Sequence, residues 1–348
     1  MLFSGIKEDN SMFKGKTILV TGGAGSIGKE VIKELLKLDP NFVRVLDNNE
    51  AGLFELEKEI SHPALGYFLG DVRDRDRMKR AVEGVDIVFH AAALKHVPIC
   101  EYNPFDAIKT NVIGTQNLLD VSLDEEVERV IAISTDKAAN PNNVMGATKL
   151  LAERLVAATN VFKGPRKTIF TSVRFGNVMA SSGSVMPVFE DQIKKGGPLT
   201  LTDKNMTRFI MPASDAVKLV FKAAEMSKGG EVFILKMPSV RIIDLAEVMV
   251  EELAPRYGYS SKDIKIKEVG SRPGEKIHEE LMTMEEARGA LETDDTFVIP
   301  PQLVLTYYRY PRYEYPRSKP AKVKEYSSAE NLLKKEELRK MVSKILKF

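Results

Sequence analysis

The chain has 348 residues and a formal net charge of +2, and 43% of its residues are hydrophobic. This length and composition predict one large or two closely joined globular domains. The near-neutral charge gives no reason to expect a nucleic-acid partner, and a single cysteine, Cys100, excludes an internal disulfide framework. No apolar run approaches the roughly 20 residues of a membrane span. We therefore expect a cytoplasmic protein.

A glycine-rich segment follows the first predicted strand. Residues 16–20 form a β-type run, and residues 29–38 follow the glycines at helical spacing. Strand, glycine loop and helix in this order are typical of a dinucleotide-binding turn, in which the helix start binds phosphates. In this interpretation Gly22 permits the tight bend, Gly25 lets the backbone approach a pyrophosphate, and Gly28 lets the helix pack on the strand. An ordinary glycine turn is the alternative. The candidate cofactor contacts are Thr21, Gly22, Gly25, Ser26, Ile27 and Gly28.

The second predicted strand, residues 42–46, leads into Asp47. An acid about twenty residues past the glycines hydrogen-bonds the adenosine ribose in dinucleotide-binding folds. Its charge repels a 2′-phosphate and no arginine immediately follows it, so the pattern favours NAD over NADP. A solvated loop carboxylate is the alternative. Asn48 is a further candidate beside it.

The next strand ends also carry candidate cofactor contacts. Asp71 and Val72 follow the apolar residues 67–69 and are placed to recognise the adenine edge. The strand at residues 85–90 leads into three small residues that let the backbone pass close to a flat ligand. These are Ala91, Ala92 and Ala93.

Several polar residues follow this strand. His90 is expected to pack at the strand end, because no second ligand stands at metal spacing. We therefore expect no metal site. Lys95 and His96 are candidates for facing the substrate, with solvent exposure as the equal alternative. Asn111 is expected to support the backbone of the central strands and so to shape the cofactor site.

The most reactive cluster follows the apolar residues 130–133, which predict a buried strand. In an open α/β sheet, ligands bind beyond the carboxyl ends of the strands, where Thr135, Asp136 and Lys137 would stand. A carboxylate beside an ammonium forms an acid/base couple, because burial and mutual charge shift both pKa values. A surface ion pair is the alternative. Met145 and Lys149 stand shortly downstream.

These motifs resemble the extended short-chain dehydrogenase/reductases. Within them, the chain is similar to the nucleotide-sugar 4,6-dehydratases of the polysaccharide-biosynthesis type, which act on UDP-N-acetylglucosamine. The resemblance runs over residues 13–298 and implies an α/β fold: a Rossmann-type doubly wound parallel sheet with a smaller, mixed α/β substrate-binding domain. The motifs that carry it are residues 21–28, 90–98, 134–137, 145–149, 174–178 and 272–281.

The expected domains follow from this comparison and from the local patterns. An NAD-binding domain would cover residues 13–175, with a return segment near 209–240. Residues 176–208 and 241–300 would bind the UDP-sugar, and residues 301–348 would form a tail and helix. Within these parts, the patterns predict short helical segments at 277–281 and 327–347.

One position departs from the superfamily pattern. The superfamily normally carries tyrosine four residues before the active-site lysine, and this chain has Met145 there. A thioether cannot exchange protons, so the usual base for a substrate hydroxyl is missing. One branch of these dehydratases resembles this chain in having methionine at this position while keeping the preceding Thr-Asp-Lys.

The resemblance implies a redox-neutral reaction in which NAD accepts hydride from C4 of the sugar, water is eliminated across C5 and C6, and hydride returns to C6. Lys137 is assigned as the C5 base, with its pKa lowered by burial and a cationic neighbour. Asp136, with a raised pKa, would protonate the leaving C6 hydroxyl. Thr135 would hydrogen-bond the 4-oxygen, and Lys149 would hold the nicotinamide ribose. The base for the 4-hydroxyl is Asp136 or a water near Lys149.

The second half of the chain supplies candidate substrate contacts. By family resemblance, Asn177 would hydrogen-bond the sugar diphosphate. Arg208 is placed to bind phosphate oxygens, with a structural salt bridge as its alternative. Arg272 would neutralise charge and Glu275 would take ribose hydroxyls, with a solvated charged turn as the alternative. The full set is Lys95, Asn177, Ser184, Val185, Pro187, Thr200, Arg208, Arg272 and Glu275.

Two rival functions remain at this point, a nucleotide-sugar 4-epimerase and a non-catalytic NAD-binding protein. Within the dehydratase reading, the configuration produced at C5 is open, and inversion is one alternative. Related enzymes pair through helices that correspond to residues 104–120 and 148–158, both of which carry apolar residues at helical spacing. We therefore expect a homodimer or a larger homo-oligomer.

Overall fold

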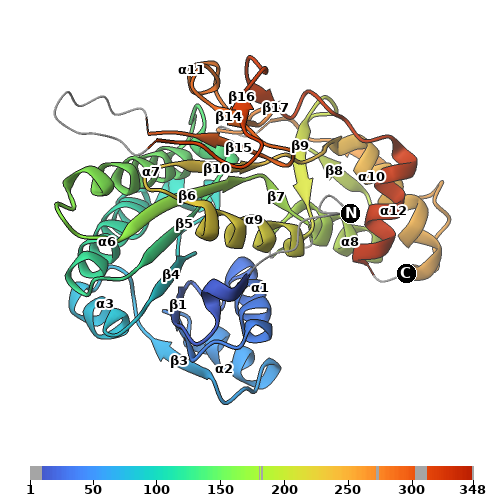
Figure 1. The fold of residues 1–348 in the computed structure, drawn as a ribbon. Coiled ribbons are helices and arrows are strands. Elements are labelled where there is room, and N and C mark those ends of the chain that lie inside the picture. Colours follow the sequence, from blue (N-terminus) through green and yellow to red (C-terminus); the bar gives the residue numbers. More distant parts are fainter. Residues whose placement is uncertain (1–9, 180, 182, 272–273, 302–311, 347–348) are drawn as a thin grey trace.

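The computed structural model describes residues 10–179, 181, 183–271, 274–301 and 312–346 (Figure 1). In this part of the chain, ten strands form one main sheet in the order β16-β14-β15-β10-β6-β5-β4-β1-β2-β3. The seven strands from β10 to β3 run parallel. They are β1 (Thr17–Thr21), β2 (Phe42–Asp47), β3 (Leu65–Leu69), β4 (Ile87–His90), β5 (Arg129–Thr135), β6 (Ile169–Phe175) and β10 (Val232–Leu235).

The strand order reverses between β1 and β4. From β1 the chain builds outward through β2 to β3, and it then returns to add β4 on the other side of β1. In doubly wound sheets, the crevice at this reversal holds the ligand, at the carboxyl ends of the strands. The expected Rossmann-type sheet is therefore confirmed.

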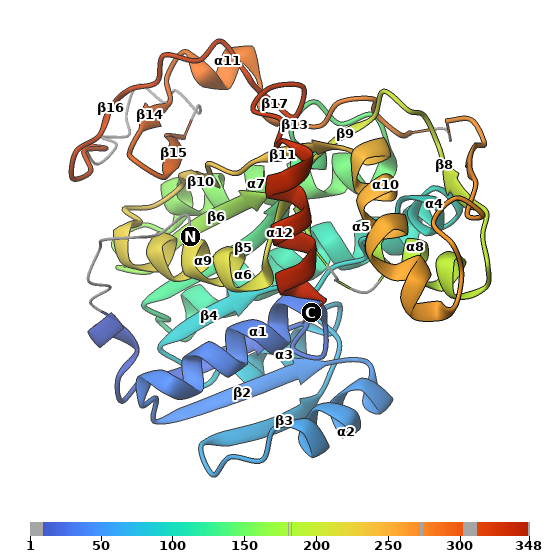
Figure 2. The same ribbon diagram turned by 90° about the vertical axis from the view of Figure 1, so that its right-hand side faces the viewer.

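Alternating side chains divide the core between the two faces of the sheet. Ile18 and Val20 of β1 enter one hydrophobic cluster, whereas Leu19 between them enters another. This is the two-residue period of a strand buried on both faces. Helices α1 (Ser26–Leu35) and α9 (Ala213–Met226) pack together on one face (Figure 2). The other face carries α3 (Arg75–Val82), α6 (Gly114–Asp124) and α7 (Val144–Phe162).

A smaller lobe has its own hydrophobic core. The C-terminal helix α12 inserts its buried Leu338 and Val342 into that core and packs against α10. A short sheet of β7, β9 and β11 lies between this lobe and the main sheet (Figures 1 and 2). The bounds are α8 (Val185–Lys194), β8 (Leu199–Leu201), α10 (Ile242–Leu253), β12 (Ile266–Glu268), α12 (Lys335–Ile345), β7 (Asn177–Val178), β9 (Thr207–Met211) and β11 (Ser239–Arg241).

Three expectations about the second half differ from the structure. The segment at 277–281 is not a helix, because β13 (Glu280–Met282) pairs antiparallel with β17 (Tyr326–Ser327). The C-terminal helix begins at Lys335 rather than at residue 327. Strands β14 (Leu291–Glu292) and β15 (Thr296–Ile299), which the expected boundaries put in the substrate region, extend the main sheet antiparallel beyond β10. Strand β16 (Lys319–Pro320) pairs with β14 at the edge.

The remaining elements are short or peripheral. Helix α2 (Glu50–Glu59) lies beside β2 and β3. The expected helix at 104–120 is interrupted by a π-helical turn, Lys109–Ile113, between α5 (Pro104–Ile108) and α6. Helix α4 (Val97–Tyr102) precedes α5, and α11 (Met284–Ala287) follows β13. Over the described ranges, no helix combines the length and apolar character needed to cross a bilayer.

Candidate active site

The glycine loop packs against the end of β4 so closely that side chains are excluded. Gly22 has a φ of +68°, and a Cβ there would lie 2.5 Å from the Ala92 backbone nitrogen. A Cβ at Gly28 would lie 2.3 Å from the Gly22 carbonyl oxygen. Helix α1 therefore begins, at Ser26 and Ile27, against a bare backbone cradle with its N–H groups directed at the loop. Such a cradle fits a pyrophosphate.

Asp47 is directly connected to this loop. Its carboxylate accepts hydrogen bonds of 3.0 Å from the backbone N–H of Ala24 and from that of Asn49. Asn48 donates to Asp71 at 3.2 Å, which joins the ends of β2 and β3. The Arg73 guanidinium hydrogen-bonds Asp71 and lowers the pKa of that carboxyl. The acidic candidates thus meet at one edge of the sheet.

The end of β4 is fixed by buried polar contacts. His90 lies between the Thr21 hydroxyl, at 2.7 Å, and the Thr115 hydroxyl, at 3.0 Å. Burial, with the Lys149 charge nearby, lowers the pKa of His90 to about 3, so the ring is neutral. Within the described ranges, no group of three or more His, Cys, Asp or Glu side chains is arranged to hold a metal ion.

Asn111 supports the segment that follows β4. Its side-chain oxygen accepts from the Leu94 N–H at 2.8 Å, and its amide donates to the Leu94 carbonyl at 3.0 Å and to Thr148 at 2.9 Å. Asn111 stands in the π-helical turn between α5 and α6. Such turns bend a helix locally and are frequent at functional sites. The Asn111 side chain therefore contacts both Leu94, which follows the Ala91–Ala93 segment, and Thr148 of α7.

The Asp136–Lys137 pair stands at the carboxyl end of β5, as the sequence predicts. Asp136 is 1% exposed, and its Oδ1 accepts from the Thr135 hydroxyl at 2.7 Å and from the Lys137 ammonium at 3.0 Å. The ammonium also lies 3.2 Å from Glu279 Oε1. A surface ion pair is therefore excluded as the interpretation, because both carboxylates are buried.

The expected lowering of the Lys137 pKa is wrong. Burial does oppose the charge, and so does Arg208, but Asp136 and Glu279 outweigh them and raise the pKa of Lys137 above its ordinary value. The reason is the second carboxylate, Glu279, which the sequence pattern does not place here. Lys137 is consequently an ammonium in the resting site.

Helix α7 brings Met145 and Lys149 to the same edge. A Cβ at Gly146 would lie 2.3 Å from the Lys137 carbonyl oxygen, so the helix start packs directly on the segment that follows β5. Met145 is 3% exposed and packs with Cys100 and Ala107. Lys149 donates to the Ile133 carbonyl at 2.7 Å, and burial lowers the pKa of Lys149 to about 8.

Several predicted substrate residues border this edge from the smaller lobe. Arg208 of β9 donates to the Thr207 and Ile277 carbonyls, and its Nε lies 3.6 Å from Glu279 Oε1. The loop before α8 reaches the segment after β4, because a Cβ at Gly183 would lie 2.7 Å from His96 Cε1. Ser184 occupies the N-cap position of α8, but its buried hydroxyl makes no capping hydrogen bond and has no partner among the described residues. The half-buried Val185 and Pro187 follow in the first turn of α8.

The other predicted residues are more dispersed. Thr200 is tied to Gln192 by two hydrogen bonds of 2.8 and 3.0 Å, which hold it within the smaller lobe. Asn177 begins β7, at the junction of the two lobes, and Lys95 is exposed before α4. Arg272 lies outside the described residues. Glu275 lies in the loop near the start of α7, where Asn143 donates to the Gly274 carbonyl at 3.0 Å.

Sequence reasoning missed a second buried network below the site. Arg174 of β6 is fully buried and pairs with Glu153 of α7 at 2.6 Å and with Glu286 of α11 at 3.0 Å. The Ser134 hydroxyl also donates to Glu153. Strand β5, strand β6 and helix α7 are thereby held together one residue before Thr135. The motif around Arg174 was noticed, but nothing local in the sequence identifies its two partners.

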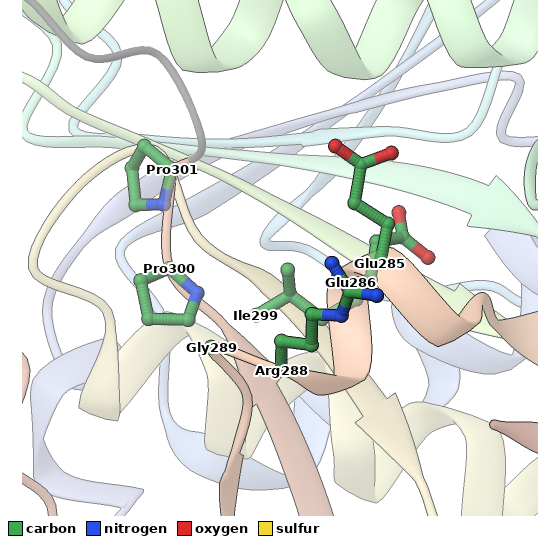
Figure 3. Close-up of a pocket in the computed structure, with 7 residues that line it drawn as sticks. All are labelled: Glu285, Glu286, Arg288, Gly289, Ile299, Pro300 and Pro301. Atoms are coloured by element: carbon green, nitrogen blue, oxygen red, sulfur yellow. The ribbon is translucent and has the colours of Figure 1, made fainter. Parts of the chain in front are cut away.

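A cavity of about 400 Å³ lies beside α11 and includes Glu286 of this network in its lining. Pro300 and Pro301 border one side of it, and Glu285, Glu286 and Arg288 border the other (Figure 3). None of the predicted cofactor or substrate residues that the structure describes lines this cavity. Asp136 and Lys137 stand at the carboxyl end of β5 instead.

Comparisons of sequence and of structure identify proteins that are similar to this chain. The sequence profile of the family described as "Polysaccharide biosynthesis protein" matches residues 18–301. An uncharacterized membrane protein of Methanocaldococcus jannaschii is 64% identical over 85% of this chain and 89% of its own length. A Campylobacter jejuni protein named UDP-N-acetylglucosamine 4,6-dehydratase (inverting) is 43% identical, covering 84% and 85% of the two chains. A Rickettsia canadensis protein named UDP-glucose 4-epimerase is 40% identical, covering 83% and 84%.

Solved structures extend the comparison. The X-ray structure of Pen from Bacillus thuringiensis is 44% identical and aligns with a TM-score of 0.88, covering 95% of this chain and 98% of that one. The dTDP-glucose 4,6-dehydratase DesIV of Streptomyces venezuelae, crystallised with NAD, is 25% identical with a TM-score of 0.66, covering 75% and 86%. Because the family profile matches most of its length, the chain belongs to the polysaccharide-biosynthesis protein family.

Proposed function

We propose that the protein is an NAD-dependent nucleotide-sugar 4,6-dehydratase that acts on UDP-N-acetylglucosamine. The observation that carries the proposal is the pair of buried Asp136 and partly buried Lys137, which stands at the same sheet edge as the glycine loop at residues 22–28. An epimerase needs the cradle but not an elimination pair. The Campylobacter jejuni relative named for this dehydration supports the choice of substrate.

The residues around the cradle fit NAD. Without side chains at Gly22, Gly25 and Gly28, the loop packs closely on the end of β4 and on the start of α1, whose free N–H groups suit a pyrophosphate. Asp47 accepts from the loop, where an adenosine ribose would bind. Lys149, with its pKa near 8, would hold the nicotinamide ribose. When bound, NAD supplies the hydride acceptor and donor for the sugar.

Elimination needs one base and one acid, and the pair supplies both by moving one proton. Lys137 passes a proton to Asp136 Oδ1 across their 3.0 Å contact, which leaves a neutral amine and a neutral carboxylic acid. Bound substrate would exclude water from the pair and so favour this exchange, because charges are penalised in a dry site. The amine then takes the C5 proton, the C5–H electrons form the C5–C6 double bond, and the acid protonates the leaving C6 hydroxyl. Water departs, and the original ion pair is restored.

The remaining site residues bind and orient the sugar nucleotide. Thr135, adjacent to Asp136, would donate to the 4-oxygen. Arg208 supplies a guanidinium for the diphosphate, and Asn177 and Ser184 supply uncharged contacts. The 4-hydroxyl proton would pass to Asp136 or to a water near Lys149, because Met145 cannot accept it.

A 4-epimerase is the second candidate, and the Rickettsia canadensis relative named UDP-glucose 4-epimerase favours it. The two are separated by incubating the purified protein with UDP-N-acetylglucosamine, measuring the product mass by mass spectrometry and the configuration at C4 by NMR. A dehydratase product lacks one water, whereas an epimerised product has the substrate's mass. An unchanged, unepimerised substrate would contradict both and favour a non-catalytic NAD-binding protein.

The cofactor preference has its own test. Asp47 should repel a 2′-phosphate, so NAD is expected to support turnover and NADP is not. Removal of bound nucleotide followed by reconstitution with each cofactor measures this directly. Equal activity with NADP would show that the ribose interpretation of Asp47 is incorrect.

A further inference from the structure

Glu279 reaches the catalytic pair from a distant part of the chain. Glu279 directly precedes β13, and Ser328 directly follows β17. Ser328 hydrogen-bonds both the N–H and the carbonyl of Glu279. The Glu279 N–H donates to the Ser328 hydroxyl at 2.8 Å, and the Glu279 carbonyl accepts from the Ser328 N–H at 2.8 Å. The side chain is only 4% exposed. The carboxylate therefore has a fixed position inside the site.

The Lys137 ammonium lies between two carboxylates from different parts of the chain, Asp136 after β5 and Glu279 before β13. Asp136 Oδ1 lies 3.0 Å from Lys137 Nζ, and Glu279 Oε1 lies 3.2 Å from it. On its other side Glu279 Oε1 lies 3.6 Å from Arg208 Nε. Asp136, Lys137, Glu279 and Arg208 thus form a line of alternating charges. It runs from the proposed elimination pair to the guanidinium expected to bind diphosphate.

Each carboxylate keeps one buried oxygen without a partner. Among the described residues, nothing hydrogen-bonds Asp136 Oδ2 or Glu279 Oε2. A carboxylate that served structure alone is expected to have its buried oxygens hydrogen-bonded, because a buried acceptor without a donor is destabilising. The two free oxygens are therefore available to accept hydrogen bonds from a bound ligand, such as one with sugar hydroxyls.

We propose that Glu279 is a positioning residue of the elimination site, which holds the Lys137 ammonium against Asp136 and keeps it protonated until substrate binds. The inference rests on the proposed function and deepens it by adding a third member to the pair. Without Glu279, Lys137 has one acidic neighbour, and both its orientation and its proton affinity change. Arg208 and Asp136 are the other charged groups that act on Lys137.

The first test measures the titration of Lys137 without any turnover. Trace acetylation with acetic anhydride across a pH series, read by mass spectrometry of the Lys137 peptide, gives the pKa of this partly exposed amine. The Glu279→Gln variant is isosteric and should lower that pKa by about one or more. Glu280→Gln, on the adjacent residue, is the matched control and should leave the pKa unchanged. An equal Lys137 titration in the parent and in Glu279→Gln would overturn the proposal.

The second test uses activity. In Glu279→Gln, the kcat for water loss should fall at least about tenfold and its pH profile should shift to lower pH, with KM within about threefold of the parent. Glu279→Asp, which restores the charge, should recover part of kcat. A loss of thermal stability with an unshifted pH profile would instead show a purely structural role. If the parent itself releases no water, the proposed function fails, whereas the acetylation result still decides the role of Glu279.

Discussion

The Lys149 ammonium donates a 2.7 Å hydrogen bond to the Ile133 carbonyl oxygen, which ties α7 to β5 two residues before Thr135. The amine is buried, and burial lowers the pKa of Lys149 to about 8. A lysine in this state is charged only part of the time at neutral to mildly alkaline pH. It therefore combines a structural contact with an amine that exchanges protons in the working pH range.

Lys149→Met should remove that amine while filling most of its volume. We expect kcat to fall about 100-fold or more, because the proposed role of Lys149 in holding the nicotinamide ribose and in nearby proton transfer requires its amine. Steady-state assay of water loss measures the change. Lys194→Met, at an exposed lysine of α8, is the control and should behave like the parent. Near-normal turnover of Lys149→Met would contradict the assigned role.

Lys137→Ala should abolish elimination more than binding. The substitution removes the proton that the pair moves, so kcat should drop by orders of magnitude. Affinity for the UDP-sugar, measured by calorimetry, should stay nearly unchanged, because Arg208 and Asn177 remain. Near-normal dehydration by the variant would show that another group removes the C5 proton.

His90 should make the protein sensitive to acid. Its pKa is about 3 in the folded state and about 6.5 in the unfolded chain, so only the unfolded state binds a proton between these values. Stability is therefore lost as the pH falls from 6.5 toward 3, by up to roughly 5 kcal/mol from this group. Urea unfolding at pH 7 and pH 4.5 measures the loss, and His90→Gln should reduce it. Parallel pH curves for the two proteins would argue against this origin.

The first half of the fold is predictable because its signals are local. The expected strand at 16–20 corresponds to β1 (Thr17–Thr21), and the helix expected over 29–38 corresponds to α1 (Ser26–Leu35) and the 3-10 turn Leu36–Leu38. The glycines, the apolar alternation and Asp47 all occur within one strand–helix–strand unit. Each of these signals depends only on neighbours in sequence.

The second half depends on contacts that local patterns do not contain. Ile277 and Leu281 stand four residues apart, which favours a helix, but pairing with Tyr326–Ser327 makes β13 a strand. The same pairing brings Glu279 to Lys137. The wrong helix prediction at 277–281 and the failure to predict Glu279 therefore have one cause. Two adjacent glutamates, Glu279 and Glu280, are visible in the motif at residues 272–281. Only the structure shows that Glu279 is the one that contacts Lys137.

An exposed apolar face should mediate self-association. Tyr102 and Phe105 are 87% and 77% exposed, and Ile99, Ile108 and Leu151 lie on the same packed helices, α4, α5 and α7. Large contiguous apolar patches mark interaction sites. We expect a homodimer or larger assembly, measured by light scattering at micromolar concentration. Phe105→Glu should weaken it, whereas Phe162→Glu, at the far end of α7, should not. A monomeric parent would refute the prediction.

Met145 is the last residue to test, because it occupies the position where the superfamily carries its tyrosine. Its side chain fills a small buried cluster with Cys100 and Ala107, bordered by Leu94, Val97 and Val144. A tyrosine there is bulkier and brings a hydroxyl into an apolar contact. Overpacking of this kind typically costs about 1–3 kcal/mol.

We therefore expect Met145→Tyr to lower thermal stability and to leave turnover similar or reduced. Met145→Leu, which conserves volume, should retain both stability and turnover. Since a thioether does not titrate, the pH–rate profile of the parent should also lack a tyrosine-like group, and only the variant could introduce one. A large gain in turnover on introducing tyrosine would mean that the parent is a degraded catalyst, and would favour a non-catalytic role for the native chain.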